Sequence, residues 1–265
     1  MKSWLNLEIA QTLQETREDM LSCKPRGRTK ASLIKKILIG SFIFLAFMHI
    51  YAFPKFTQSY GDPCYLNKAK FNALTHILHS TVAVLQKRNE TYWLDYGSLM
   101  GFYRARGVMR YDSDIDMGRL IHSDPEKEKH FYKVFVEDMK KHHVDVIKNG
   151  TMLRRRAEDG DYVFGDLMVW RRSTITQDDK KISVLTRRDP KWKESMMLKV
   201  AKSMGAGDIP EKWVLPPRPQ VLSSGQIVHV PRNYERVIRF RYPFSWRIPF
   251  PYKWKCWLPW NYPES

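Results

Sequence analysis

The sequence predicts an α+β fold, a mixed sheet flanked by helices, preceded by one N-terminal transmembrane helix. Two kinds of periodicity alternate along the 265-residue chain: apolar residues at helical spacing, and short runs of β-branched and aromatic residues typical of strands. A third observation is an apolar run from Ile37 to Phe53 that contains no Asp, Glu, Lys or Arg. The chain therefore reads as roughly one folded domain behind a membrane-spanning segment.

The apolar run divides the chain into four parts. Its 17 residues lie at the short end of what spans a bilayer at about 1.5 Å of rise per residue. A cluster of lysines and arginines comes before it, and such clusters stay on the cytoplasmic side. We therefore expect a single-pass type II membrane protein whose folded part is luminal. The predicted parts are a cytoplasmic basic tail (1–36), a transmembrane signal anchor (37–53), a stem or linker (54–66) and a luminal domain (67–265).

A cleaved signal peptide is the alternative interpretation of this run. Signal peptides normally have a brief charged region and a small-residue cleavage site. Here a long basic segment comes first, and the run ends in His49, Tyr51, Phe53 and Pro54. These features favour an uncleaved anchor. Because a short span suits the thinner membranes of the early secretory pathway, we expect the Golgi apparatus or the endoplasmic reticulum, with the Golgi as first choice.

Helix and strand patterns alternate after the anchor. Apolar residues from Phe71 to Leu85 stand near helical spacing. Asn149-Gly150 is a strong signal for a two-residue hairpin turn. The expected elements are helices at 68–88, 125–141 and from Pro231 or Arg232 to Phe240, a short helix opening at Gly97-Ser98, strands at 92–95, 162–170 and 226–230, and a hairpin of 144–148 with 151–156.

Three aspartates occupy alternate positions at Asp112, Asp114 and Asp116. In an extended strand Asp114 and Asp116 project from the same face. Two such carboxylates hold a hard divalent cation such as Mg²⁺ or Mn²⁺, whose other positions go to water and phosphates. A solvated acidic turn is the alternative. The ligand pattern argues against a calcium loop of the EF-hand type, because its sixth and twelfth positions hold Met117 and Ser123 instead of Gly and Glu.

Gly97 and Ser98 open the short helical pattern before these acids. Gly97 lets the backbone approach a phosphate closely, and Ser98 offers a hydroxyl and an N–H at a helix start, where anions are favoured. A Gly-Ser pair alone is a routine turn. Together with the acids that follow, it is typical of phosphoryl transfer.

Asp166 is the best candidate for a third metal ligand. It stands in the strand pattern from Tyr162 to Trp170, and an aspartate among apolar residues is unfavourable unless it binds something. We expect this strand to lie beside the strand of Asp114 and Asp116. The alternative is an ion pair with Arg171 or Arg172, and the fallback ligands are Asp161 and Asp145.

The segments WLDYGSLMGFYR and RYDSDIDMG resemble the LicD family, which includes fukutin and the fukutin-related protein. The family pattern is a G-[ST]-L-L-G-x-x-R stretch followed by a D-x-D-x-D stretch. A second block resembles it through Val230 to Tyr234, whereas Pro243 stands where the family usually has Gly. The positions that match the two motifs are Gly97, Ser98, Gly101, Arg104, Asp112, Asp114 and Asp116.

This resemblance implies a nucleotidyltransferase-like fold and transfer of a phospho-alcohol, such as phosphocholine or ribitol phosphate, from a CDP-activated donor to a glycan hydroxyl. It also implies donor binding by the first motif and binding of Mg²⁺ or Mn²⁺ by the acids, with Asp112 as orienting group or base. Residues 171–208 are charged and poor in periodic apolar positions, so we expect a poorly ordered or donor-facing insertion there. The expected catalytic residues are Asp112, Asp114, Asp116 and Asp166, the metal ligands Asp114, Asp116 and Asp166, and the donor-binding residues Gly97, Ser98, Gly101 and Arg104.

The charge of the chain leaves two other classes of function to weigh. Lys+Arg 45 against Asp+Glu 28 gives a formal net charge of +17, which suits nucleic acid, an anionic membrane or a phosphorylated substrate. The anchor and the lack of nucleic-acid-binding signatures argue against nucleic acid. A catalytically inactive, membrane-anchored accessory or glycan-binding protein is the stronger alternative, although the crowded acids argue against it.

The cysteines and the glycosylation motifs give weak support to a luminal domain. Cys64 and Cys256 fall on the luminal side, where a disulfide persists, and their pairing stays open at this point. Two acceptor motifs, at Asn89 and Asn149, fall on the same side. Such tripeptides arise often by chance.

Overall fold

The computed structural model describes residues 27–52, 63–147, 150–177, 179–187, 207–243, 245–247 and 256. It divides the chain into two compact units, Met1–Asp62 and Pro63–Ser265. The second unit thus starts just before the predicted domain boundary at residue 67.

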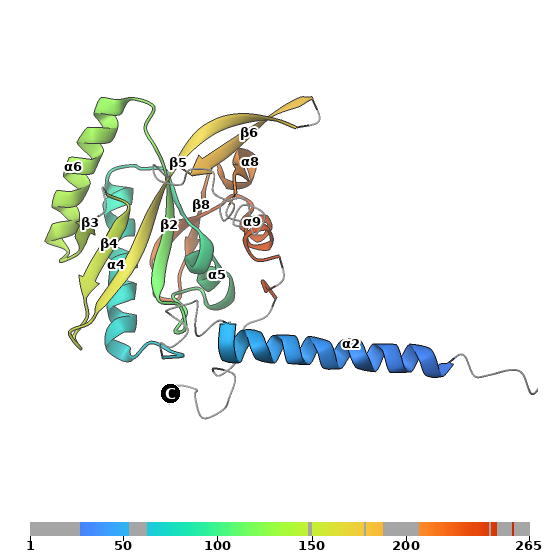
Figure 1. Ribbon diagram of the computed structural model, residues 1–265. Helices are drawn as coiled ribbons and strands as arrows, with labels where there is room; N and C mark the ends of the chain where they lie inside the picture. Colours follow the sequence, from blue (N-terminus) through green and yellow to red (C-terminus); the bar gives the residue numbers. More distant parts are fainter. Residues whose placement is uncertain are drawn as a thin grey trace, which may run out of the picture. The chain divides into compact units, whose positions relative to one another are not determined.

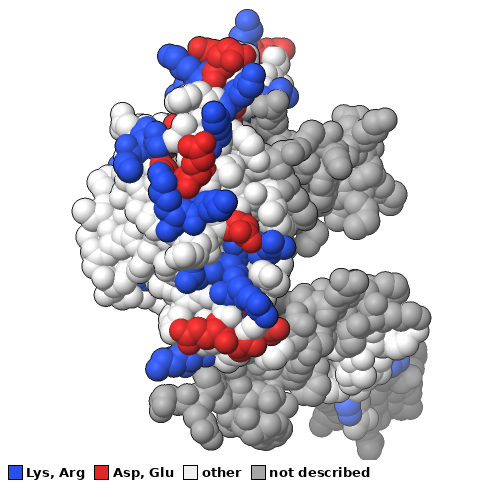
Figure 2. Space-filling model, turned by 90° about the vertical axis from the view of Figure 1, so that its left-hand side faces the viewer, with Lys and Arg blue, Asp and Glu red and all other residues white. Residues whose placement is uncertain are grey.

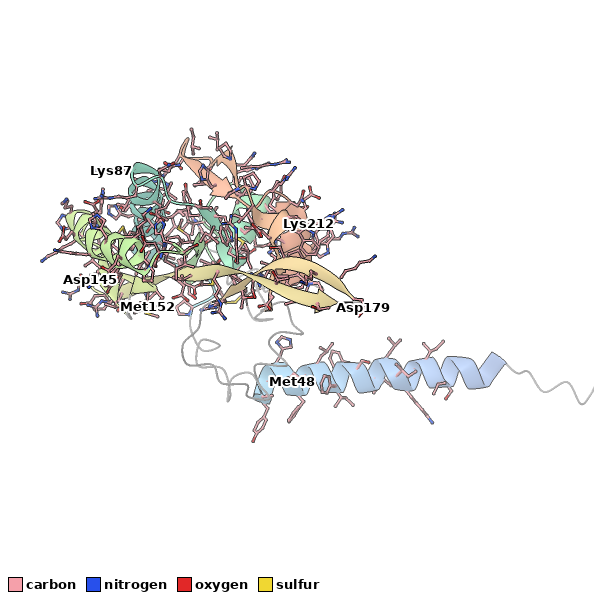
Figure 3. All side chains as sticks on the ribbon, turned by 90° about the horizontal axis from the view of Figure 1, so that it is seen from above. Met48, Lys87, Asp145, Met152, Asp179 and Lys212 are labelled. Carbon is pink, nitrogen blue, oxygen red and sulfur yellow. A yellow bond between two sulfur atoms is a disulfide. The ribbon has the colours of Figure 1, made fainter. Side chains whose placement is uncertain are left out.

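The described part of the first unit is one helix. It runs as α2 (Gly27–Phe47) and ends in a π-helical turn, η1 (Met48–Ala52). The stretch Ser32–Ala52 has a mean hydropathy of 1.9, and none of the side chains in its most apolar 18 residues is buried; Figure 3 shows side chains projecting around the helix axis. By length and composition this helix can cross a membrane. It begins before the predicted anchor, inside the basic segment.

A seven-stranded mixed sheet forms the centre of the second unit. Its path is β1-β2-β5-β4-β3, with β6 added to β5 and β7 added to β6. Among the described strands of this sheet, β2 and β5 alone are parallel neighbours. The strands are β1 (Tyr92–Leu94), β2 (Asp114–Leu120), β3 (Asp145–Ile147), β4 (Met152–Arg156), β5 (Tyr162–Gln177), β6 (Lys180–Arg187) and β7 (Ile209–Pro210).

Helices cover the sheet and complete the core. In Figure 1, α4 and α6 lie toward the β3–β4 edge, and α5, α8 and α9 lie on the other side of β2. Buried apolar residues of α4, including Leu74 and Ile77, pack against the strands, and Trp93 and Trp170 are fully buried beside each other. The helices are α4 (Lys68–Lys87), α5 (Tyr96–Ala105), α6 (Pro125–Lys141), α8 (Glu211–Val214) and α9 (Tyr234–Arg241).

The mixed fold and most predicted elements are confirmed. The helix expected at 125–141 is α6 residue for residue, because Asp124 caps it and Pro125 stands at its first position. The predicted hairpin forms from β3 and β4, although residues 148 and 149 of its turn lie outside the described part. A separate two-stranded sheet, β8 (Arg218–Val221) with β9 (Ile227–Val230), precedes α9.

The expectation of a poorly ordered insertion is wrong for residues 171–187. β5 continues to Gln177 and pairs with β6 from Trp170↔Arg187 to Gln177↔Lys180. Beyond Trp170 the two strands run on as a two-stranded arm past the end of β2, with Asp179 at its tip (Figures 1 and 3). Alternating threonine and isoleucine residues supply the strand pattern that the flanking charges obscured. The rest of the predicted insertion, 188–206, lies outside the described residues.

A disulfide joins the beginning of the second unit to its end. Cys64 and Cys256 are bonded across 192 positions of sequence, and the Cys256 side chain is buried. The Tyr65 hydroxyl donates to the Cys256 carbonyl oxygen at 3.2 Å. The pairing that the sequence left open is therefore made.

Candidate active site

The two parallel strands bring three carboxylates together. Asp116 in β2 is the register partner of Asp166 in β5, so the two side chains project from the same face of the sheet. Asp114 precedes Asp116 by two residues and shares that face. Ligand oxygens of the three residues all lie within 4.8 Å of one another. The sequence-predicted metal ligands thus converge at one point of the fold.

Burial and mutual repulsion raise the pKa of the acids in this cluster. Burial, followed by the charge of Asp114, raises the pKa of Asp112 to about 7. The pKa of Asp114 is raised by burial and then by the charge of Asp166. Asp116 has a pKa well above its ordinary value, again from burial and then from Asp114 and Asp112, while the Gly97 N–H acts against this shift. A bound cation would relieve this repulsion.

The donor set fits a hard divalent cation. Three carboxylates offer only oxygen ligands, which Mg²⁺ and Mn²⁺ prefer. The ligands come from a rigid pair of neighbouring strands, so their geometry does not depend on a loop. Asp114, Asp116 and Asp166 are the residues that would hold such an ion.

The first turn of α5 contacts the carboxylate strand directly. The Gly97 N–H donates to Asp116 Oδ2 at 3.1 Å, and the Asp116 N–H donates to Ser98 Oγ at 2.8 Å. A Cβ on Gly97 would lie 2.3 Å from Asp112 Oδ2, so only glycine leaves room for this carboxylate. Here both residues orient the acids; phosphate binding by them stays a prediction.

The structure places Gly101 and Arg104 in packing contacts of the same helix. A Cβ on Gly101 would lie 2.5 Å from the Gly107 carbonyl oxygen, so glycine lets the following loop close onto α5. Arg104 donates to the Tyr111 hydroxyl at 2.9 Å and to the Ser245 carbonyl oxygen at 2.8 Å. Donor binding by these two residues remains a prediction from the family resemblance.

A buried ion pair that the sequence did not reveal fixes the start of α5. Asp95 accepts from the Tyr96 N–H at 2.9 Å, and Arg241 of α9 donates to both oxygens of Asp95 at 3.2 and 3.1 Å. Both side chains are 1% exposed. The Arg241 guanidinium also lies 4.1 Å from the centre of the Tyr96 ring. The pair therefore holds the helix start against the carboxylates.

Tyr96 and Tyr242 lie close enough to the acids to feel their charge, and Arg187 lies near Tyr96. Burial raises the pKa of Tyr242, and the charges of Asp116 and Asp112 raise it further. Burial also raises the pKa of Tyr96, while the positive charges of Arg241 and Arg187 lower it. Arg187 is exposed and faces the same side of the sheet as Trp170, its register partner. Within the described part of the chain Arg187 makes no ion pair.

The family's sequence profile agrees with this architecture. The profile described as LicD/FKTN/FKRP, nucleotidyltransferase domain, matches residues 89–233, more than half of the chain. The class of the protein is therefore that of a transferase with a nucleotidyltransferase-type domain. The chain belongs to the LicD family.

Two bacterial relatives share a shorter stretch. An uncharacterized protein of Rickettsia typhi, RT0683, is 26% identical over 100 residues, which are 37% of this chain and 31% of the relative. The uncharacterized protein RP689 of Rickettsia prowazekii is 26% identical over 90 residues, 33% of this chain and 34% of the relative. The chain thus matches about a third of the length of these relatives.

Two solved structures of antibiotic-resistance proteins have a weak structural similarity to this chain. The resistance factor ANT(2'')-Ia has a TM-score of 0.34 and 17% identity, covering 69% of this chain and 79% of that one. The lincosamide adenylyltransferase LnuA has a TM-score of 0.31 and 14% identity, covering 66% and 85%.

Proposed function

We propose that this chain transfers a phospho-alcohol, of the phosphocholine or ribitol phosphate type, from a CDP-activated donor to a glycan hydroxyl of a glycoprotein or glycolipid. In this reaction the bond between the alcohol-bearing phosphorus and the CMP oxygen breaks. A bond from the acceptor oxygen to that phosphorus forms, the acceptor loses its proton, and CMP leaves. The observation that carries the proposal is the convergence of Asp114, Asp116 and Asp166 beside the start of α5.

The chain's own residues have separate roles in this proposal. Asp114, Asp116 and Asp166 would hold one or two ions of Mg²⁺ or Mn²⁺, which would supply positive charge against the donor pyrophosphate and the leaving CMP. Asp112, two residues before Asp114 and buried beside it, accepts the acceptor's proton in this proposal.

Arg187 is our choice for the cation that binds the donor phosphates. Arg104, the residue that the family motif suggests, already donates to Tyr111 and to the backbone at Ser245. Arg187 is exposed and close enough to Tyr96 to lower that residue's pKa, and Tyr96 adjoins Gly97. A guanidinium in that position can form two hydrogen bonds to a phosphate.

The proposed location is the lumen of the Golgi or endoplasmic reticulum, with segment 37–53 as a type II anchor. A helix of suitable length and hydropathy covers that segment up to Ala52. The Cys64–Cys256 disulfide supports an oxidising compartment. On this proposal the stem is short, since the disulfide-bonded unit already begins at Pro63.

Nucleic acid is not part of the proposal. On the face formed by α6 and the β3–β4 edge, Figure 2 shows basic and acidic side chains interleaved instead of a single basic patch. In α6 the residues Glu126, Glu128 and Glu137 separate the lysines. Positive charge on this face therefore has local acidic partners.

The test measures CMP release and metal binding separately. The purified full chain in detergent is incubated with a panel of CDP-alcohols, an acceptor glycan and Mg²⁺ or Mn²⁺, with EDTA as control. Release that requires metal supports the transferase and identifies the donor. Calorimetry on the same preparation measures metal and nucleotide affinity. Absence of both release and binding would favour the inactive accessory or glycan-binding protein instead.

A further inference from the structure

The turn between α4 and β1 carries a side chain that the proposed reaction does not use. Asn89 follows the last turn of α4 with a φ of 55°, a left-handed conformation that asparagine tolerates better than most residues. Its backbone N–H donates to the Gln86 carbonyl oxygen at 2.9 Å. Its side chain is exposed and makes no hydrogen bond to the described residues.

Another asparagine near α4 shows the contrast. The side chain of Asn67 accepts from the Lys70 N–H at 2.8 Å and donates to Asp159 Oδ2 at 2.7 Å. Asn67 therefore has a structural task as the cap of α4. The Asn89 amide has no such task among the described residues, so a group attached to it displaces no contact of the fold.

Asn89, Glu90 and Thr91 form an acceptor motif for N-linked glycosylation. Glu90, the middle residue, is not proline, and its carboxylate turns inward to His122 Nε2 at 2.9 Å and Arg119 Nη1 at 3.4 Å. With Glu90 held inward, the neighbouring Asn89 is exposed. The turn therefore presents the acceptor amide at the surface.

The location of this turn is compatible with a bulky group. The Thr91 carbonyl oxygen accepts from the Leu120 N–H at 2.9 Å, at the end of β2. Asp114 begins the same strand six residues earlier, which corresponds to about 20 Å at about 3.3 Å per residue. A glycan on Asn89 would thus stand at the opposite end of the strand from the carboxylates and leave them open.

We propose that Asn89 carries an N-linked oligosaccharide. The inference rests on the luminal orientation in the proposed function but not on the transferase activity. The oligosaccharide comes from a lipid-pyrophosphate donor through the cell's oligosaccharyltransferase. The bond from the anomeric carbon to the phosphate oxygen breaks, the Asn89 Nδ2 forms the new bond to that carbon and loses a proton, and the lipid pyrophosphate leaves.

The test uses the full chain expressed in animal cells and the mobility shift produced by an amide-cleaving glycosidase. All variants carry Asn149→Gln, so that the second motif contributes nothing. We expect the glycosidase to increase the mobility of this parent and to leave Asn89→Gln and Thr91→Ala unchanged. Thr91→Ser is the matched control, since a serine hydroxyl preserves the motif, and it should keep the shift.

An engineered acceptor motif distinguishes two failures: a domain that is not luminal, and a luminal domain in which Asn89 is not modified. Asp179→Asn with Lys181→Thr creates an acceptor motif at the exposed tip of the arm. Modification at the tip without modification of Asn89 overturns this inference and leaves the proposed orientation standing. Modification at neither place overturns the luminal orientation and this inference together. A shift in the parent that survives Asn89→Gln also overturns it.

Discussion

Charged side chains gather at both ends of strand β2. At the C-terminal, balanced end opposite charges pair with each other, whereas at the N-terminal, unbalanced end like charges lie together. Near the C-terminal end of the strand, Arg119 is 2% exposed, pairs with Glu90 and Glu128 and lies 4.0 Å from the centre of the Phe131 ring. At the N-terminal end Asp112, Asp114 and Asp116 crowd together, and within the described residues none of the three makes an ion pair with a lysine or arginine.

The difference separates a structural cluster from a candidate binding site. A buried charge that is paired and hydrogen-bonded is part of the fold, and removing its partner destabilises it. Carboxylates that raise one another's pKa are instead held together by the surrounding structure, in this case by α5 and the Asp95–Arg241 pair. Of the two ends, it is the unbalanced one where a bound cation would relieve repulsion between carboxylates.

Removal of one acid at the unbalanced end should have the largest effect on function. We expect Asp116→Asn to lower CMP release by about 10³-fold, the scale of losing one essential electrostatic contact, and to abolish metal binding in calorimetry. The metal-free melting temperature should not fall, because one repelling charge is gone. Asp145→Asn, an exposed pair member at the sheet edge, is the matched control. A variant that retains full activity would falsify the metal site.

Removal of the arginine at the balanced end should instead unfold the protein more easily. Arg119→Met leaves Glu90 and Glu128 without their cation, and we expect a loss of about 3–5 kcal/mol in the free energy of unfolding. Urea titration of the full chain in detergent measures it. Metal affinity of the fraction that stays folded should be unchanged. A large loss of affinity with normal stability would reverse the assignment of the two ends.

The buried pair behind α5 should show an intermediate effect. Arg241→Lys keeps the charge but loses the two-point contact with Asp95. Because partners that orient metal ligands typically change metal affinity by about 10–100-fold, we expect a loss near the lower end of that range. Arg239→Lys, two residues away, changes an exposed arginine that pairs with Glu235 and lies over the Trp246 ring, and it should leave metal affinity unchanged. Equal behaviour of the two variants would contradict a positioning role.

A methyl group at the helix start should have a smaller effect. Gly97→Ala places a Cβ against the Asp112 carboxylate, and we expect activity to fall about tenfold at near-normal stability, the equivalent of about 1.4 kcal/mol. Gly107→Ala is the control, since its Cβ would make ordinary contacts, with Ser223 Oγ at 3.4 Å and the Ala105 carbonyl oxygen at 3.9 Å. Initial rates and melting temperatures of both variants test this prediction, and equal rates for the two variants would contradict it.

The smallest expected effect on activity concerns a paired acid away from the site. Hydrogen bonds from Lys141 and Arg88 lower the pKa of Asp138 to about 2. A lowered folded-state pKa stabilises the fold above the unfolded value near 3.8, and this contribution is lost as the pH falls through about 2. Urea midpoints should therefore differ between the parent and Asp138→Asn at pH 6 and converge toward pH 2. A constant difference would contradict the assignment.

Local signals in the sequence predicted most of this architecture, but they do not predict which distant residues pair. The helical pattern from Pro125 to Lys141 predicted α6, and the acid inside an apolar strand pointed to Asp166. The Asp95–Arg241 pair joins positions 146 apart, and no local pattern predicts such a contact. The register that sets Asp116 opposite Asp166 likewise appears only in the folded sheet. The arm was missed because charged residues concealed its alternating pattern.

The bond between Cys64 and Cys256 makes the second unit a covalent ring. In the chain-entropy description, closing so long a loop disfavours the unfolded chain by about 5 kcal/mol. The ring also changes the outcome of proteolysis. A single cut anywhere between the two cysteines opens the ring but leaves both pieces joined, and they can separate only after the disulfide is reduced.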